Sequence, residues 1–244
     1  VLTVTTFQQT KVWKNSNTLW TQVIQHYPRT TTAFSNRGHY FRDGGNFTEA
    51  VKNYDAALGI NSSKAEIYNS RGKLYFENGQ TERAIQDYTT GISKDPTIAE
   101  LYANRGGAYG ATGKLDLAIQ DLNKSVELDP DFTNAYLNRS IAYYQRGQYD
   151  LAILDYTAYL QRDPYRADIW YERGLARFNL EQHAAALADF SQAIALDGSQ
   201  GSYYQMRSRT YRALGKRAEA RTDAQVRKAR ATTIREGIRF GPSQ

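Results

Sequence analysis

Aromatic, small and charged positions recur along this chain with a fixed spacing of 34 residues, from residue 31 to residue 234 and without an insertion. Within each unit of 34, the fourth position is aromatic, the seventh is Arg and the twentieth is Ala. The aromatic residues are Phe34, Tyr68, Tyr102, Tyr136, Trp170 and Tyr204, and the alanines are Ala50, Ala84, Ala118, Ala152, Ala186 and Ala220. Because a side chain as small as alanine lets two antiparallel helices approach closely, the pattern predicts a pair of packed helices in every unit.

Glycine and proline mark the turns in the same register. The fifteenth position is Gly45, Gly79, Gly113, Gly147 and Gly215 in five of the units, and the thirty-second is Pro96, Pro130 and Pro164 in three. Such a Gly permits a left-handed residue between the paired helices, and such a Pro ends the second helix. The unit from 167 to 200 departs from the pattern, because Glu181 replaces the turn Gly and Arg177 replaces an aromatic residue. We therefore expect that unit to pack more loosely.

The register divides the chain into an N-terminal segment, six repeats and a tail. The repeats are residues 31–64, 65–98, 99–132, 133–166, 167–200 and 201–234. Continued backwards, the register places Trp20 and Val23 at second-helix positions and Pro28 at the turn. This predicts that residues 1–30 form a half-repeat or a membrane-proximal segment, and leaves residues 235–244 as a C-terminal tail.

The recurring phrase resembles the signature of the tetratricopeptide-repeat family, which reads aromatic-x2-Leu-Gly-x2-Tyr, then Ala-x3-Phe, then Pro. The resemblance spans about five-sixths of the chain, although Arg stands where the family usually has Leu. It implies an all-α fold, a right-handed superhelical solenoid of six tandem helix-turn-helix repeats with an N-terminal half-repeat and a basic C-terminal capping helix. It also implies a scaffold that binds a protein or peptide ligand in the concave groove of the superhelix.

The Arg at the seventh position needs a partner, and the twenty-third position supplies an acid in repeats two to six. Antiparallel pairing of the two helices places these positions side by side. The predicted ion-pair ladder consists of Arg71 with Asp87, Arg105 with Asp121, Arg139 with Asp155, Arg173 with Asp189, and Arg207 with Asp223. In repeat one Asn53 replaces the acid, so Arg37 is expected to be the freest arginine. The alternative is that the arginine row binds a phosphate or a carboxylate.

The resemblance places positions 2, 5, 6, 9, 12 and 13 of each first helix in the groove. The candidate peptide-binding residues there are Asn36, Asn104, Asn138, Phe76, Tyr144, Tyr171 and Phe178. An Asn amide can donate to and accept from an extended peptide backbone at once, and aromatic rings make good anchors. The alternatives are that the Asn side chains only solvate the groove and that some of the rings pack between repeats. The residues with which chaperone-binding members of the family clamp a C-terminal carboxylate are absent here.

The net charge of +6 is concentrated at the C-terminal end. Residues 205–244 carry eleven Arg or Lys against three acids, which leaves the rest of the chain slightly acidic. The cluster comprises Arg207, Arg209, Arg212, Arg217, Arg221, Arg227, Lys228 and Arg230. We interpret it as the polar outer face of a terminal helix, which no further repeat covers. Binding of nucleic acid or of anionic lipid headgroups is a less favoured alternative, since no aromatic residues interleave with the arginines to stack bases.

Composition gives catalysis and metal binding little support. The chain has no Cys, and its three His residues are not spaced as a metal-binding pair on a helix. No nucleophile elbow, phosphate-binding loop or dinucleotide fingerprint occurs. We therefore expect no enzymatic activity, no cofactor and no metal.

The N-terminal segment suggests an alternative setting for the repeats. No apolar run approaches the roughly 20 residues needed to span a bilayer. However, the phrase from Val12 to Pro28 resembles a junction in certain polytopic membrane proteins of glycosyltransferase type, where it joins the last membrane helix to a repeat domain outside the cytosol. On that hypothesis residues 1–10 are the stub of a spanning helix and the repeats recruit an acceptor protein outside the cytosol. Otherwise a cytoplasmic location is expected, and the oligomeric state is open in both cases.

Overall fold

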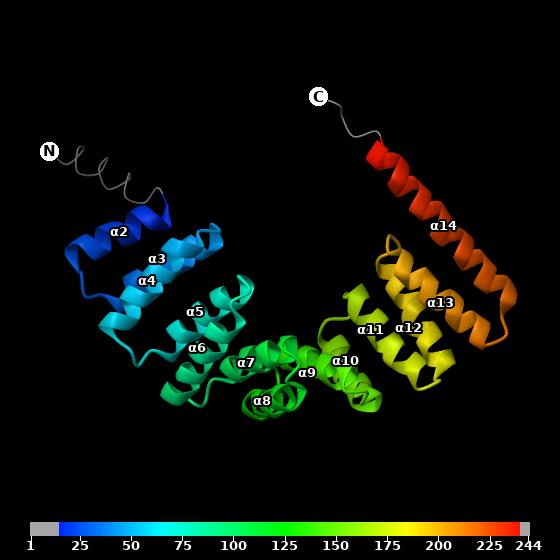
Figure 1. Ribbon diagram of the computed structural model, residues 1–244, viewed down its shortest axis with the longest axis horizontal. Coiled ribbons are helices and arrows are strands. Elements are labelled where there is room, and N and C mark those ends of the chain that lie inside the picture. The colour runs from blue at the N-terminus through cyan, green and yellow to red at the C-terminus, as the bar shows by residue number, and fades with distance from the viewer. Residues whose placement is uncertain (1–14, 240–244) are drawn as a thin grey trace. The chain divides into compact units, whose positions relative to one another are not determined.

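The described part of the chain is entirely helical. The computed structural model describes residues 15–239, with side chains from residue 15 to residue 229, and these residues form thirteen helices and no strand (Figure 1). The helices are α2 (Ser16–His26), α3 (Thr31–Asp43), α4 (Phe47–Ile60), α5 (Ala65–Glu77), α6 (Thr81–Lys94), α7 (Ala99–Ala111), α8 (Leu115–Leu128), α9 (Thr133–Gln145), α10 (Tyr149–Arg162), α11 (Ala167–Asn179), α12 (His183–Leu196), α13 (Gly201–Ala213) and α14 (Arg217–Arg239). The prediction of an all-α fold of tandem helix pairs is confirmed.

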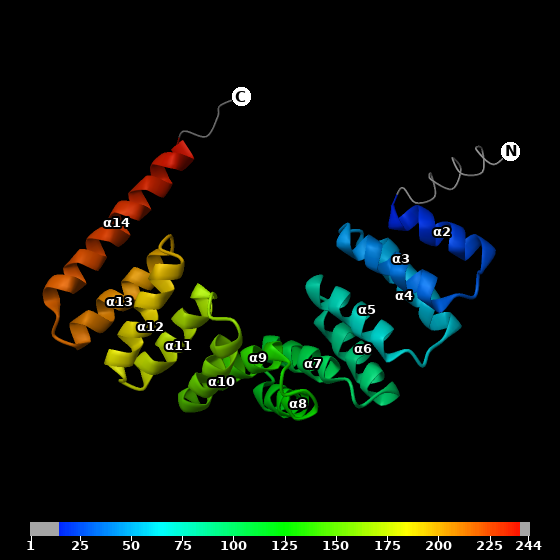
Figure 2. The same ribbon diagram turned by 180° about the vertical axis from the view of Figure 1, so that it is seen from behind.

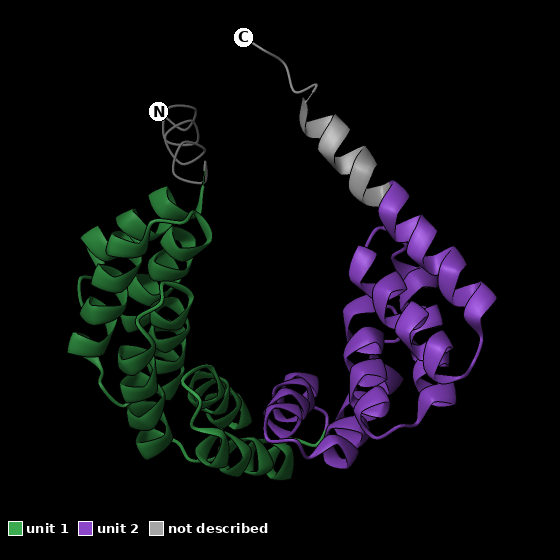
Figure 3. Cartoon of the chain, turned by 45° about the vertical axis from the view of Figure 1, so that its right-hand side comes forward, with its two compact units in different colours: residues 1–130 green, residues 131–244 purple. Residues whose placement is uncertain are grey.

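The helices group into two compact units, shown in different colours in Figure 3. Unit 1, residues 1–130, holds α2 and repeats one to three, and unit 2, residues 131–244, holds repeats four to six. Inside each unit the two helices of a repeat pack against each other, and a second helix also packs against the first helix of the next repeat. At the start of unit 1, α2 packs against α3, as the view from behind in Figure 2 also shows.

In repeats one, two and five a buried ring of the second helix packs on a glycine of the first helix. Tyr54, Tyr88 and Phe190, at position 24 of their repeats, are fully buried. A Cβ atom added at Gly72 would lie 2.6 Å from the Cε1 atom of Tyr88, and Gly38 and Gly174 meet their rings in the same way. The ring can therefore reach the first helix only because position 8 lacks a side chain. In repeat six, where position 8 is Ser208, position 24 is Ala224.

The turn between the paired helices uses a left-handed residue in both units. The φ angles at this position are 72° for Gly45, 73° for Gly79, 74° for Gly113, 77° for Gly147 and 74° for Gly215. In repeat five Glu181 adopts the same conformation, with φ 58°. The backbone N–H of Gln182 then donates to the carbonyl of Arg177 at 2.9 Å, as the corresponding residues do in the other turns. Glu181 thus preserves the turn, although a residue with a Cβ atom disfavours a positive φ angle.

Repeat five does not pack loosely, and our expectation for it was wrong. Ala186 and Phe190 are fully buried in its core. Arg177, which takes the place of an aromatic residue, donates from Nη1 to Asp189 Oδ2 at 2.9 Å. A charged residue that reaches a buried carboxylate can occupy the position of the ring without leaving an unpaired charge.

The two ends of the described chain differ. At the N-terminal end Asn15 caps α2, because its side chain accepts a hydrogen bond from the Thr18 backbone N–H at 3.0 Å. At the other end α14 has 23 residues, whereas the second helices of repeats one to five have 14. Of the helices in residues 15–239, none combines the length and the apolar character needed to cross a membrane. Residues 1–10, where we predicted the stub of a spanning helix, lie outside the described residues.

Candidate functional site

The structure brings together all five of the predicted arginine–aspartate pairs. In repeat three Arg105 donates from Nε to Asp121 Oδ2 at 2.7 Å and from Nη2 to Asp121 Oδ1 at 2.8 Å. The same two-pronged geometry, with distances of 2.7–3.0 Å, occurs in Arg71–Asp87, Arg139–Asp155, Arg173–Asp189 and Arg207–Asp223. The five carboxylates are buried. The hydrogen bonds to Asp121 raise the pKa of Arg105, against the opposing effect of burial.

The same arginines also reach back to the preceding repeat. Arg105 Nη1 donates to Thr89 Oγ1 at 3.1 Å, and Arg173 Nη1 donates to Thr157 Oγ1 at 3.0 Å. Equivalent bonds join Arg71 to Asp55 and Arg207 to Ser191. The acceptors all stand at position 25, which we did not predict to have a role. The sequence does contain a sign of these bonds, because position 25 carries a side chain with a hydrogen-bond acceptor in every repeat.

Arg37 forms no ion pair in the described chain, in line with its prediction as the freest of these arginines, but it still makes two hydrogen bonds. Its Nε donates to Asn53 Oδ1 at 2.7 Å, and its Nη1 donates to Thr21 Oγ1 on α2 at 3.2 Å. The amide oxygen of Asn53 thus takes the role of the missing carboxylate. Arg37 thereby ties repeat one to α2.

Aromatic rings cover the guanidinium groups. The Cζ atom of Arg105 lies 5.9 Å from the ring centroids of both Tyr102 and Tyr109, at positions 4 and 11. Arg71, Arg139 and Arg207 are placed between two tyrosines in the same way. This arrangement provides cation–π contacts on both sides and follows from the i, i+3 and i, i+4 spacing on one helix. Because their donors and faces are occupied, the geometry favours a structural role for these arginines over anion binding.

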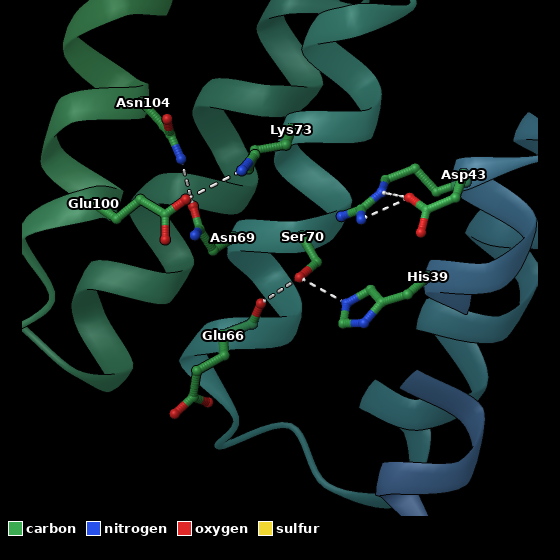
Figure 4. Close-up of polar contacts among 9 residues, drawn as sticks. His39, Asp43, Glu66, Asn69, Ser70, Lys73, Glu100 and Asn104 are labelled. Atoms are coloured by element: carbon green, nitrogen blue, oxygen red, sulfur yellow. Dashed lines mark hydrogen bonds and ion pairs between the residues drawn. The ribbon is translucent and has the colours of Figure 1, made fainter. Parts of the chain in front are cut away.

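We use the name first-helix face for the surface formed by positions 2, 5, 6, 9, 12 and 13 of the first helices of one unit. In unit 1 polar contacts join this face from repeat to repeat (Figure 4). His39 Nε2 lies 3.2 Å from Ser70 Oγ, and Lys73 Nζ lies 3.1 Å from Glu100 Oε1. The face of unit 1 is therefore a continuous row of polar groups on α3, α5 and α7.

The predicted residues of unit 1 have different surroundings. Asn104 Nδ2 donates to Asn69 Oδ1 at 2.8 Å, so Asn104 already spends one of its donors inside the protein (Figure 4). Asn36 lines an open hollow of about 690 Å³ together with Trp20 and His39. Phe76 is 38% exposed. These three residues belong to three different repeats, so they do not form one compact site.

In unit 2 the predicted aromatic residues are braced by neighbours and remain partly exposed. Asn179 Nδ2 donates to the hydroxyl of Tyr144 at 3.1 Å, which links α9 to α11. The ring of Tyr171 lies 4.8 Å from that of Tyr203 on α13. Phe178 lies under the guanidinium of Arg209, 5.5 Å from its Cζ atom. These rings therefore pack between repeats, as one of the alternatives predicted, and still reach the surface, while their role as anchors stays a prediction.

Two side chains of this face in unit 2 form no side-chain hydrogen bond or ion pair with the residues that the structure describes. Asn138, on α9, is partly buried and makes no side-chain hydrogen bond with any described residue. Glu172, on α11, is also partly buried and forms neither a hydrogen bond nor an ion pair within the described chain. Burial raises the pKa of Glu172 above its ordinary value, and the charge of Asp168 adds to the shift.

The arginines of the basic cluster at the C-terminal end have two kinds of surroundings. Arg207 is bound to Asp223. Arg209, Arg212 and Arg227, in contrast, line a hollow of about 250 Å³ between α13 and α14, together with Gln205, Ser208 and Ala224. The side chain of Arg230 lies outside the described ones. Among the residues that are described, no group of three His, Cys, Asp or Glu could hold a metal ion.

Comparison with solved structures finds the same helical fold in other proteins. The chain matches MamA from Desulfovibrio magneticus RS-1 (residues 41 to the end) with a TM-score of 0.66 and 20% identity, over 70% of this chain and 96% of that chain. A further MamA crystal structure matches with a TM-score of 0.62 and 25% identity, over 71% of this chain and 94% of that chain. YrrB, described as a TPR protein with an unusual peptide-binding site, matches with a TM-score of 0.62 and 22% identity, over 73% of this chain and 92% of that chain.

Comparison of sequences identifies the family. No curated protein matches the chain in a sequence search. The family profile described as TPR repeat matches residues 38–79 and 72–113, and profiles described as tetratricopeptide repeat match residues 99–132 and 137–201. These matches together extend over more than half of the chain, and they agree with the helix pairs seen in both units. The chain belongs to the tetratricopeptide repeat family.

Proposed function

We propose that the chain binds a partner polypeptide on the first-helix faces of its two units. Membership of the tetratricopeptide repeat family supports a general protein-binding role. The peptide-binding site named for YrrB, a protein of similar fold, agrees with the proposal. Since fold alone does not give function, the proposal depends on the side chains themselves.

The observation that carries the proposal is the state of Tyr144, Tyr171 and Phe178. Contacts with neighbouring repeats hold these rings in place, yet they remain partly exposed. A ring that is ordered before binding loses little conformational entropy when a partner packs on it. Such rings are favourable anchors for a polypeptide.

The asparagines supply polar groups for the backbone of the partner. Asn138 has no internal side-chain partner, and Asn104 uses one donor on Asn69 and keeps its amide oxygen available. An extended polypeptide offers N–H and C=O groups in alternation, which an amide can bind together. We infer that each asparagine holds the backbone of a polypeptide bound on the face of its own unit, and that the rings of unit 2 hold side chains.

The proposal is tested with peptides selected from a random display library on the wild-type protein. We expect the double variant Asn104→Ala and Asn138→Ala to weaken their binding about two- to tenfold, because a peptide on either face loses a hydrogen bond of about 0.5–1.5 kcal/mol. The matched control is Gln86→Ala with Gln192→Ala, which removes two exposed amides from the second helices α6 and α12. Equal affinity for the wild type and the asparagine variant would refute the role of the asparagines.

A second candidate function is the binding of anions at the C-terminal end of unit 2. The hollow lined by Arg209, Arg212 and Arg227 supports it, because no acidic residue lines the same hollow. Guanidinium groups bind phosphate and carboxylate oxygens strongly. Nucleic acid and anionic lipid headgroups are both ligands of this chemistry.

A further inference from the structure

Glu172 is exceptional among the acidic residues of the described chain. Apart from Glu172, each described Asp or Glu that is not exposed has a hydrogen bond or an ion pair. The aspartates of the arginine pairs show the usual solution, in which a buried carboxylate is neutralised by a guanidinium. A carboxylate that is partly removed from water without such a partner is held in an unfavourable state.

Partly exposed aromatic side chains share the first-helix face of unit 2 with this carboxylate. Burial raises the pKa of Tyr144, Tyr156, Tyr171 and Tyr203, and the charge of Glu172 adds to each of these shifts. Tyr144 is fixed by Asn179, and Tyr171 is fixed against Tyr203. Ile141, at position 9 of the preceding repeat, is 39% exposed. The first-helix face that holds Glu172 thus also presents rings and an aliphatic side chain.

No basic side chain of the described residues forms an ion pair with Glu172, although the charge of Arg209 acts on the neighbouring Tyr171. Arg209, a basic residue on the same face, lies over the ring of Phe178 and contacts Met206 Sδ at 3.7 Å. Arg166 is paired with Asp168, at 2.6 Å. An unneutralised carboxylate beside ordered rings combines the two features that bind an organic cation, an ion pair and a cation–π surface.

We propose that Glu172, with the rings of Tyr144 and Tyr171, receives a lysine or arginine side chain of the bound polypeptide. The inference depends on the proposed function, because the cation arrives as part of the partner held on the first-helix face of unit 2. The aliphatic stem of the incoming side chain packs on the rings, and its charged end reaches the carboxylate. The partner is therefore a polypeptide with a basic residue at a fixed place in its bound segment.

The experiment selects peptides from a random display library on three proteins: the wild type, Glu172→Gln and Glu66→Gln. Glu66→Gln is the matched control, because Glu66 is an exposed acid on the first-helix face of unit 1. Circular dichroism establishes that all three are folded. We expect peptides from the wild type and from Glu66→Gln to share a Lys or Arg at one position, and peptides from Glu172→Gln to lack it.

A second measurement uses one selected peptide and its Lys→Gln or Arg→Gln variant. We expect each single change, in the peptide or at Glu172, to weaken binding about tenfold, and the second change to add little once the first is made. Peptides that bind without a shared basic residue, or whose two changes add independently, would overturn this inference and leave the proposed function standing. Failure to select any peptide that competes for the first-helix face would overturn both.

Discussion

Arg105 and Asp121 are joined by two parallel hydrogen bonds, of 2.7 and 2.8 Å, that connect the first and second helices of repeat three. A third bond, from Arg105 to Thr89, reaches the second helix of repeat two. One side chain therefore holds together its own hairpin and the stack of two repeats. Because the same arrangement recurs in both units, these arginines are structural elements of the fold.

Loss of the carboxylate should destabilise the repeat strongly. Asp121→Ala leaves Arg105 partly buried without its partner, and we expect the free energy of unfolding to fall by about 3 kcal/mol or more. Urea and thermal unfolding followed by circular dichroism measure the change. Glu77→Ala, which removes an exposed acid from the same unit, should change it by less than about 0.5 kcal/mol. An unaltered melting temperature in Asp121→Ala would count against the ladder.

The turn of repeat five is a site for stabilisation. Glu181 holds a φ angle of 58°, which costs a residue with a Cβ atom about 1 kcal/mol. We expect Glu181→Gly to raise the free energy of unfolding by roughly that amount, and Gly147→Ala in the neighbouring repeat to lower it. Glu181→Ala serves as the control, because it removes the charge and keeps the strain. A gain in Glu181→Ala equal to that in Glu181→Gly would show that charge, and not conformation, is responsible.

The contact between ring and glycine predicts opposite effects for two similar substitutions. Gly72→Ala places a Cβ atom 2.6 Å from the ring of Tyr88, so we expect a loss of about 1–3 kcal/mol. Gly59→Ala, in a second helix and with nothing within 4 Å of its Cβ position, should gain up to about 1 kcal/mol from helix propensity. Chemical unfolding of both variants tests the contact. Similar changes in the two proteins would contradict it.

The isolation of Glu172 predicts a pH dependence of stability. Its pKa is raised in the folded state, so the folded protein holds the proton more tightly than the unfolded chain does. Stability is therefore lost as the pH rises through the interval between the unfolded and the folded pKa values. Asp168 and the surrounding tyrosines are present in both proteins compared, so Glu172→Gln isolates the effect. We expect this variant to be more stable than the wild type at pH 7, with the difference vanishing below the ordinary pKa of Glu; a constant difference at all pH values would argue against it.

The hollow at the C-terminal end predicts anion binding that depends on salt. We expect binding to single-stranded RNA or to anionic vesicles to weaken steeply between about 50 and 200 mM salt, and to be reduced in Arg209→Gln with Arg212→Gln. The control is Arg83→Gln with Arg146→Gln, at exposed arginines outside the cluster. No salt-sensitive binding to either ligand would leave the cluster as a polar cap. A response to only one of them would identify the ligand class.

The fold could be predicted from the sequence because the same 34-residue pattern specifies the two helices of every repeat. Recurrence of Ala50 and its equivalents, with Gly45 and its equivalents, fixes both helices and the turn of each repeat. Antiparallel packing then brings Arg105 next to Asp121, which requires no knowledge of other repeats. The bond from Arg105 to Thr89 was missed because it joins different repeats, and their relative placement is set by stacking.

The candidate site could be predicted only in part. Position in the repeat identifies Tyr144 and Phe178 as residues of the first helices, but it does not reveal that Asn179 and Arg209 hold them. The isolation of Glu172 depends on which side chains of α9 and α13 fail to reach it. The spacing of residues along one helix does not show whether a side chain of another helix reaches Glu172, so its lack of a partner could be seen only in the structure.

Photo-crosslinking tests the central claim, that the first-helix faces bind the partner, most directly. A photoreactive phenylalanine analogue is placed at Phe76 or Phe178 on these faces, and at Leu117 or Leu154, which are 43% and 65% exposed on the second helices α8 and α10. Each protein is irradiated with a peptide selected on the wild type. The account predicts crosslinks from Phe76 or Phe178 and none from the two leucine positions. Crosslinks from Leu117 or Leu154 alone would contradict it.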